Sequence, residues 1–212
     1  MKPYDEGGPL MEGSLEERRD YGGAKYGMWF FLLTELLFFG GMFLLYAIFR
    51  YRFPSEFHAG ASEENLVLGT INTVLLLTSS LFIAAAITAV KRGNNKLSVI
   101  LQALTVVSGV IFLIIKGTEW GEKIAKGLYP ASSVLLKMGK GEILYFGLYY
   151  VMTGLHGLHV LVGIIVISFM MYYTATGKIN RDYSVRLENT GLYWHFVDMV
   201  WIFLFPLFYL VT

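Results

Sequence analysis

The sequence predicts an all-α fold, a polytopic bundle of five transmembrane helices. Of its 212 residues, 55% are hydrophobic and only 16% are charged, whereas soluble domains carry roughly 25% charged residues. The charged residues are clustered and leave five apolar stretches close to the roughly 20 residues that span a bilayer. A net charge of +1 without a basic face excludes a nucleic-acid partner. The absence of cysteine excludes disulfides and thiolate metal sites.

A polar N-terminal tail is expected over residues 1–26, followed by a five-helix transmembrane domain over 27–212. The tail lacks the short apolar stretch and cleavage site of a secretory signal, so we expect it to stay in the cytoplasm. The first span is predicted over 27–49 and contains one carboxylate, Glu35. The second is predicted over 66–90 and carries a polar stripe of Asn72, Thr73, Thr78, Ser79 and Ser80.

The third span is predicted over 97–115 and continues into Lys116, Glu119 and Trp120. Lys116 and Glu119 are three residues apart, which places them on one helical face. We expect an ion pair of structural function near the outer end of the helix, where solvent or lipid head groups reach it.

The fourth span is predicted over 143–173 and contains His156 and His159 on one helical face. Small residues at Thr153, Gly154 and Gly157 favour close approach of a neighbouring helix. A metal would need a third strong ligand at this depth, and two haem ligands usually come from different helices. Neutral imidazoles that hydrogen-bond across helices are therefore the favoured interpretation, with metal or haem ligation as the alternative.

The fifth span is predicted over 192–211 and has His195 and Asp198 in its first turns. A carboxylate near a helix N-terminus is favoured by the helix dipole. Tyr193 and Trp194 suit the aromatic belt at a membrane surface. Structural contacts are favoured here, with lipid head-group or subunit contact as the alternative.

Glu35 lies about eight residues into its span, roughly 12 Å deep at the usual helical rise. An unpaired ionised carboxylate at that depth is costly, so we expect Glu35 to be protonated or paired. A proton-related or lipid-facing carboxyl and a neutral acid that ties two helices together are equally favoured.

Five spans place the two termini on opposite sides of the membrane. The loops on the N-terminal side carry ten Lys and Arg residues, against seven on the other side. The positive-inside rule then predicts a cytoplasmic N-terminus and an outer C-terminus.

Five motifs, in order along residues 27–211, resemble those of cytochrome c oxidase subunit III. They are MWFFLLTELLFFGGMF at 28–43, NTVLLLTSS at 72–80, IKGTEW at 115–120, YVMTGLHGLHVLVG at 150–163 and YWHFVDMVWIFLFPLFYL at 193–210. The fuller form of that family has seven spans. This chain resembles the short bacterial form, which keeps the last five.

The resemblance implies a non-catalytic subunit of a proton-pumping terminal oxidase in the bacterial inner membrane. Such a subunit packs on subunit I, alongside subunit II and the other oxidase subunits, and carries no redox centre. Haem and copper then belong to partner subunits, bound phospholipid is expected, and a larger respiratory assembly is a further possible partner. The resemblance also implies support of proton uptake and of stability during turnover.

By the same resemblance, Glu35 corresponds to the acid that reacts with carbodiimide. Glu119, His156, His159, His195 and Asp198 correspond to intramembrane structural, lipid or subunit contacts, and no catalytic, cofactor-binding or metal-binding residue is implied.

Two related functions and one unrelated function remain as alternatives. Accessory subunits of quinol oxidases and of some nitric oxide reductases are similar, although quinol-oxidase relatives usually lack a glutamate at the position of Glu35. A proton-coupled transporter that uses Glu35 and the histidines is the distant alternative. Transporters often show inverted repeats and broken helices, and this chain has neither an evident repeat nor an intramembrane proline before Pro206.

Overall fold

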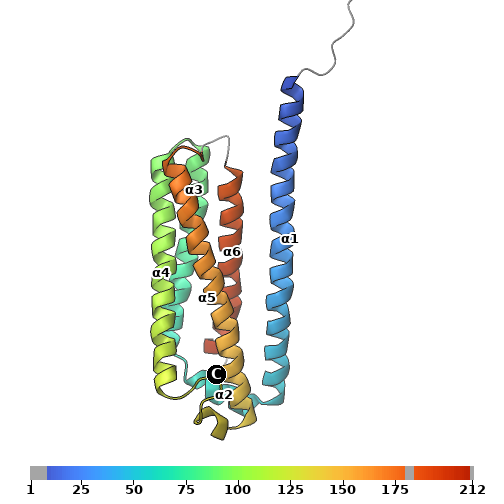
Figure 1. Cartoon of the computed structure of the whole chain (residues 1–212). Coiled ribbons are helices and arrows are strands. Elements are labelled where there is room, and N and C mark those ends of the chain that lie inside the picture. Colours follow the sequence, from blue (N-terminus) through green and yellow to red (C-terminus); the bar gives the residue numbers. More distant parts are fainter. Residues whose placement is uncertain (1–8, 180–183, 211–212) are drawn as a thin grey trace, which may run out of the picture.

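The computed structural model describes residues 9–179 and 184–210, with side chains described from residue 22 onward. Within these ranges the ordered elements are helices: α1 Pro9–Arg52, α2 Pro54–Ser62, α3 Leu66–Lys91, α4 Asn95–Ala125, the short η1 Leu135–Lys137, α5 Lys140–Ala175, α6 Val185–Phe205 and the wide terminal turn η2 Pro206–Leu210. Figure 1 shows α3 to α6 as one bundle with α1 at its side.

Five of the described helices are long and apolar enough to cross a membrane, which confirms the predicted all-α bundle of five spans. They cover Gly22–Arg52, Leu66–Lys91, Asn95–Ala125, Lys140–Ala175 and, with η2 included, Val185–Leu210. Part of the expected polar tail is helical, because α1 begins at Pro9. Residues 1–8 of that tail lie outside the described residues.

Polar residues at the helix starts set where α3 and α4 begin. Asn65 Oδ1 accepts hydrogen bonds from the backbone N–H groups of Val67 and Leu68, at 3.1 and 3.2 Å. Asn94 Oδ1 accepts one from Leu97 N at 3.1 Å. These side chains satisfy N–H groups that have no partner within their own helix. The short turn between α3 and α4 also needs Gly93, whose φ is +79°.

The bundle core is built around Trp194 on α6, which is fully buried. Its indole Nε1 donates to Ser79 Oγ on α3 at 2.9 Å. The ring fits against α4 and α5 because Gly109 and Gly163 have no side chain. A Cβ at either position would lie 2.9 or 2.7 Å from a ring atom.

Of the glycines predicted to allow close approach, Gly154 is in tight contact, since a Cβ there would lie 3.1 Å from the Trp120 ring of α4. A Cβ at Gly157 would lie 3.8 Å from Leu113, which is an ordinary contact.

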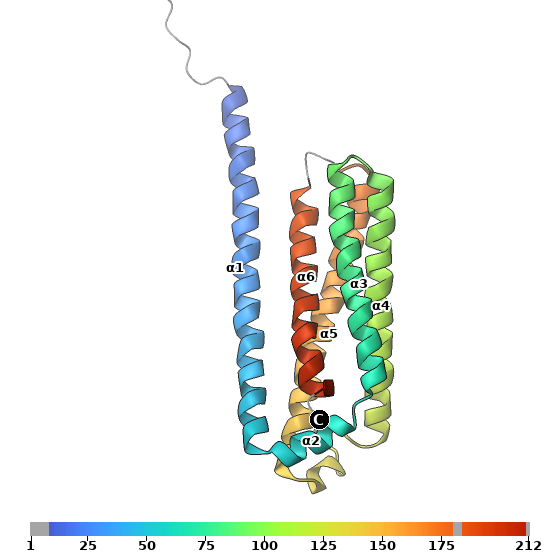
Figure 2. The same ribbon diagram turned by 180° about the vertical axis from the view of Figure 1, so that it is seen from behind.

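Helix α1 packs mainly against α5 and α6 and stands at the edge of the bundle (Figures 1 and 2). Near its C-terminal end, the buried Tyr46 donates a hydrogen bond to the Leu207 carbonyl. Near its N-terminal end, Lys25 Nζ lies 3.6 Å from the Glu188 carboxylate of α6. Between these contacts one face remains open, and Leu37 is 69% exposed. That face suits lipid or a partner protein.

Candidate functional site: two acid–base pairs between the helices

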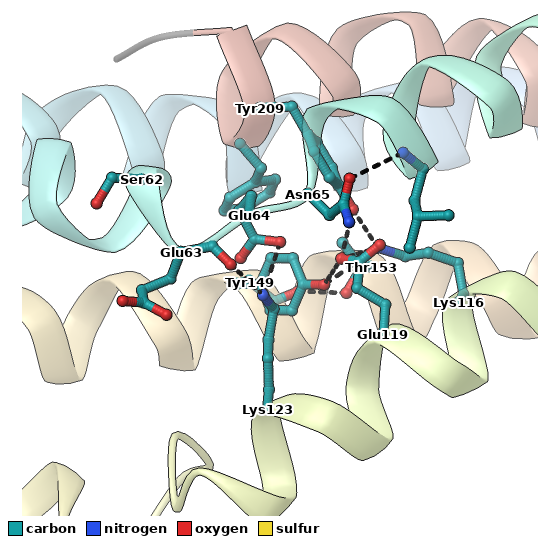
Figure 3. Close-up of polar contacts among 12 residues, drawn as sticks. Ser62, Glu63, Glu64, Asn65, Lys116, Glu119, Lys123, Tyr149, Thr153 and Tyr209 are labelled. Atoms are coloured by element: carbon teal, nitrogen blue, oxygen red, sulfur yellow. Dashed lines mark hydrogen bonds and ion pairs between the residues drawn. The ribbon is translucent and has the colours of Figure 1, made fainter.

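The first pair joins Lys116 and Glu119 on α4, where Lys116 Nζ lies 3.1 Å from Glu119 Oε1. The side chains are only 8% and 2% exposed. Lys116 also donates to the Tyr149 hydroxyl at 3.1 Å and to the Tyr209 hydroxyl at 2.6 Å. Its three ammonium protons are therefore all used, which satisfies a buried cation. Figure 3 shows the side chains of this cluster turned toward one another.

Two tyrosines from other helices complete the surroundings of Glu119. Tyr149 on α5 and Tyr209 on η2 both donate to Glu119 Oε1, the Tyr209 bond at 2.6 Å. Tyr209 reaches this position because its ring packs on Gly69 of α3, where a Cβ would lie 2.7 Å from it. The ammonium of Lys116 also lies 5.0 and 5.2 Å from the centres of the Tyr149 and Tyr209 rings, in cation–π range.

A second lysine extends the cluster toward the linker between α2 and α3. Lys123 Nζ lies 3.0 Å from Glu64 Oε2 and donates to the Glu63 carbonyl at 3.2 Å. The Lys123 and Glu64 side chains are 5% and 0% exposed. Lys116, Glu119, Lys123, Glu64, Tyr149 and Tyr209 are called the buried network below.

The buried network differs from the expected ion pair in its surroundings. Lys116 and Glu119 do pair, but solvent does not reach them as expected. The reason is that side chains from other elements surround these residues: Tyr149 from α5, Tyr209 from η2 and, next to Lys123, Glu64 from the linker between α2 and α3 (Figure 3). Tyrosine hydroxyls take the place that water was expected to fill.

The second pair joins Glu35 on α1 to His159 on α5, with Glu35 Oε2 3.1 Å from His159 Nε2. The other ring nitrogen of His159 is hydrogen-bonded to the Leu155 carbonyl at 2.7 Å, so Nδ1 carries the hydrogen and Nε2 can accept or donate toward Glu35 according to its protonation. The side chains are 20% and 17% exposed. Glu35 is therefore paired, through one contact that crosses between α1 and the bundle.

His156 lies on the same helix but in different surroundings from His159. It is 1% exposed, and neither ring nitrogen has a hydrogen-bond partner among the described residues. Its ring instead lies 5.2 Å from that of Trp201 and 5.5 Å from that of Phe112, centre to centre. The expectation of a hydrogen bond across helices is therefore not met at His156, because aromatic rings fill the space that a polar partner would need.

His195 and Asp198 do not pair with each other. The Ser80 hydroxyl of α3 is hydrogen-bonded to His195 Nδ1. Asp198 is 3% exposed, and neither of its carboxyl oxygens meets a donor in hydrogen-bond geometry within the described ranges. The structure thus brings Glu35 to His159 and Glu119 to Lys116, and leaves His156 and Asp198 elsewhere in the bundle.

Sequence reasoning missed four members of the buried network: Glu64, Lys123, Tyr149 and Tyr209. The spacing of Lys116, Glu119 and Lys123 was an available signal, since it places all three on one face of α4. Nothing comparable points to Glu64, which lies in a linker and far along the chain from its partners. In the part of the chain that the structure describes, no group of three or more His, Asp or Glu side chains could hold a metal ion.

Comparisons with known proteins agree on the relatives of the chain. It is 30% identical over 193 residues to a haem-copper oxidase subunit I+III of Aeropyrum pernix, covering 88% of this chain and 22% of that larger protein. It is 32% identical over 187 residues to cytochrome c oxidase subunit 3 of Synechocystis, covering 88% of this chain and 75% of that one. A probable quinol oxidase subunit 3 of Staphylococcus saprophyticus is 30% identical over 201 residues, covering 93% and 94%.

The family model for cytochrome c oxidase subunit III matches residues 20–212, which include all five spans. The chain is therefore a multi-pass membrane protein of the oxidase subunit III type, and the protein belongs to the cytochrome c oxidase subunit III family.

Proposed function

We propose that this chain is the non-catalytic subunit III of a proton-pumping cytochrome c oxidase in the aerobic respiratory chain. In this role it packs on subunit I, next to subunit II, while haem and copper are held by those partner chains. The observation that carries the proposal is the relative that joins subunits I and III in one protein, because fusion keeps two chains side by side. The exposed apolar face of α1 is suited to contact with a partner subunit or with phospholipid.

Purification through a tag on this chain in mild detergent tests the proposal. We expect the two large oxidase subunits, a haem spectrum and phospholipid in the purified sample. Oxidation of reduced cytochrome c by that sample supports the proposed electron donor. A colourless chain without partners would contradict membership of an oxidase, and nitric oxide reductase chains would move the function to nitrogen-oxide respiration.

Quinol oxidation is the second candidate function of the complex. It is favoured by the relative named a probable quinol oxidase subunit 3, which this chain covers almost completely. The same purified sample distinguishes the two, because a quinol oxidase consumes oxygen with a reduced quinol and not with reduced cytochrome c.

We assign Glu35 as the proton-related, carbodiimide-reactive carboxyl of the chain. Glu35 is a partly exposed acid inside a span, at the edge of the bundle. The carboxyls of Glu64 and Glu119, by contrast, are 0% and 2% exposed. A hydrophobic carbodiimide added to the membrane should therefore react at Glu35.

Glu35→Gln should abolish labelling by a hydrophobic carbodiimide while the subunit still assembles, because the amide keeps the shape of the acid and can bond His159. Mass spectrometry of the labelled peptide measures this. Glu142→Gln is a control, since Glu142 lies at the start of α5 and accepts a bond from Gly139. Continued labelling of the Glu35→Gln variant would show that another carboxyl reacts.

We also propose that the chain lies in the bacterial cell membrane with its N-terminus in the cytoplasm. Since the sequence has no cysteine, single introduced cysteines report sidedness without background. Ser62→Cys, at the exposed last residue of α2, should react in whole cells with a maleimide that cannot cross membranes. Arg92→Cys, in the opposite loop, should react only after the cells are opened, and the reverse pattern would invert the topology.

A further inference from the structure

Three carboxyl oxygens in the buried network have no hydrogen-bond donor among the described residues. They are Oε1 and Oε2 of Glu64 and Oε2 of Glu119. Lys123 Nζ lies 3.0 Å from Glu64 Oε2 as an ion pair, but without hydrogen-bond alignment. A buried carboxylate oxygen without a donor is costly, so this deficit calls for an explanation.

The donors around these oxygens are already in use. Lys116 donates to Glu119 Oε1 and to the hydroxyls of Tyr149 and Tyr209. Both tyrosines donate their own hydrogens to the same Oε1 of Glu119. No hydrogen of these side chains is left for Glu119 Oε2.

Tyr149 links the surroundings of the two carboxyls. Its hydroxyl donates to Glu119 Oε1, and Lys123, the ion-pair partner of Glu64, lies 5.3 Å from the centre of its ring. The two carboxyls are near enough for Glu119 to act on the pKa of Glu64. Two ionised carboxylates repel each other and cannot hydrogen-bond, because neither has a hydrogen to give. Close pairs of carboxyls in proteins instead share one proton, which removes the repulsion between like charges. Glu119, which receives three donors on Oε1, is the better site for the negative charge.

We propose that Glu64 and Glu119 form a proton-binding site at the end of the bundle, in which a Glu64 carboxylic acid donates its hydrogen to Glu119 Oε2. One added proton on Glu64 gives Glu119 Oε2 a donor and makes one Glu64 oxygen a hydroxyl. The other Glu64 oxygen can then face Lys123. With the proton bound, Lys116, Lys123, Glu64 and Glu119 together carry one net positive charge. Without it they carry none. The inference is independent of the electron donor of the oxidase.

The charges that face Glu64 agree with this assignment. Burial raises the pKa of Glu64 to about 8, and Glu119 acts in the same direction, while Lys123 and Lys116 oppose the rise. From α5, the phenols of Tyr145, Tyr149 and Tyr150 face the same carboxyl, and Tyr209 faces it from η2. The site is therefore protonated at neutral pH and releases its proton in mildly alkaline solution.

The proton also links the stability of the fold to pH. The folded state holds it up to about pH 8, whereas an unfolded chain loses it near the ordinary glutamate value of 4.5. Stability from this group is thus complete below pH 4.5 and declines as the pH rises to about 8. Above that pH, two carboxylates repel each other between the α2–α3 linker and α4.

Infrared difference spectroscopy of the purified complex, or of the full chain in detergent, tests the proposal. At pH 6 the spectrum of the wild type minus that of Glu64→Gln should contain the carbonyl band of one protonated carboxyl, and this difference should disappear with a midpoint near pH 8. Taking the difference removes the bands of other buried carboxyls, such as that of Asp198. Glu63→Gln is the matched control, because the neighbouring Glu63 is 45% exposed and paired with Lys126 at 2.9 Å, so it should keep the band. Identical spectra of wild type and Glu64→Gln at pH 6 would overturn the proposal.

A second variant keeps the test decisive should Glu64→Gln fail to assemble. Lys123→Met removes the cation that opposes protonation, so the midpoint of the band should move to higher pH. An unchanged midpoint would show that the titrating carboxyl is not beside Lys123. Heat denaturation gives an independent readout: wild type should lose heat resistance between pH 6 and pH 9, and Glu64→Gln should lose less.

Discussion

Two of the acid–base pairs in this bundle have the same length and opposite surroundings. Glu119 and Lys116 meet at 3.1 Å, and so do Glu35 and His159. The first pair is almost fully buried, and its Glu119 receives further hydrogen bonds from Tyr149 and Tyr209. The second is partly exposed and depends on a single contact between α1 and α5.

This difference teaches that distance alone does not assign a role to an intramembrane charge. A pair held by donors from several helices fixes how those helices meet, and losing one member leaves a buried charge without compensation. A pair at the edge of the bundle remains open to reagents and to proton exchange. The first arrangement favours a structural role, and the second favours a reactive one.

Of the variants that test this comparison, Lys116→Met should lower the free energy of unfolding most. It leaves Glu119 buried without its cation, and breaking a buried pair typically costs about 3–5 kcal/mol. The free energy of unfolding in mild detergent, followed by tryptophan fluorescence, measures the loss. Adding Glu119→Gln to the same chain should restore part of it, because the uncompensated charge is then gone.

Lys126→Met is the matched control, since Lys126 pairs with Glu63 at 2.9 Å but is 59% exposed. Solvent replaces that contact, so unfolding should be unchanged within error. Equal effects of Lys116→Met and Lys126→Met would end the distinction between buried and exposed pairs in this protein.

His159→Leu should lower the free energy of unfolding by an intermediate amount. Glu35 loses its hydrogen bond to His159, but its side chain is 20% exposed and is therefore not sealed inside the bundle. A lost hydrogen bond that leaves its partner unsatisfied costs about 1–3 kcal/mol. The unfolding free energy and the retention of the subunit during detergent purification measure it. His58→Leu, at an exposed histidine of α2, should change neither. Full retention and unaltered stability of His159→Leu would argue that the contact between α1 and α5 does not depend on this pair.

The five spans could be predicted from the sequence because apolar length decides membrane crossing with little help from tertiary structure. The pairing of Lys116 with Glu119 was also predictable, since both lie on one turn of one helix. The contact of Glu35 with His159 was not, because it depends on how α1 packs on α5. Glu64 was harder still, because it reaches the site from the linker between α2 and α3 and pairs with Lys123, which lies far along the chain.

The pairing of α1 has a consequence for how the protein is made. Its main contacts are with α5 and α6, which follow it in the chain and leave the ribosome later. Helix α1 must therefore remain in the lipid, with Glu35 not yet bonded to His159, until α5 has been made. A membrane helix can wait in this way because its backbone hydrogen bonds are already satisfied within it. Packing of α1 onto the bundle thus comes after the synthesis of α5 and α6. A partner that bound the α5- and α6-facing side of α1 before then would compete with these two helices.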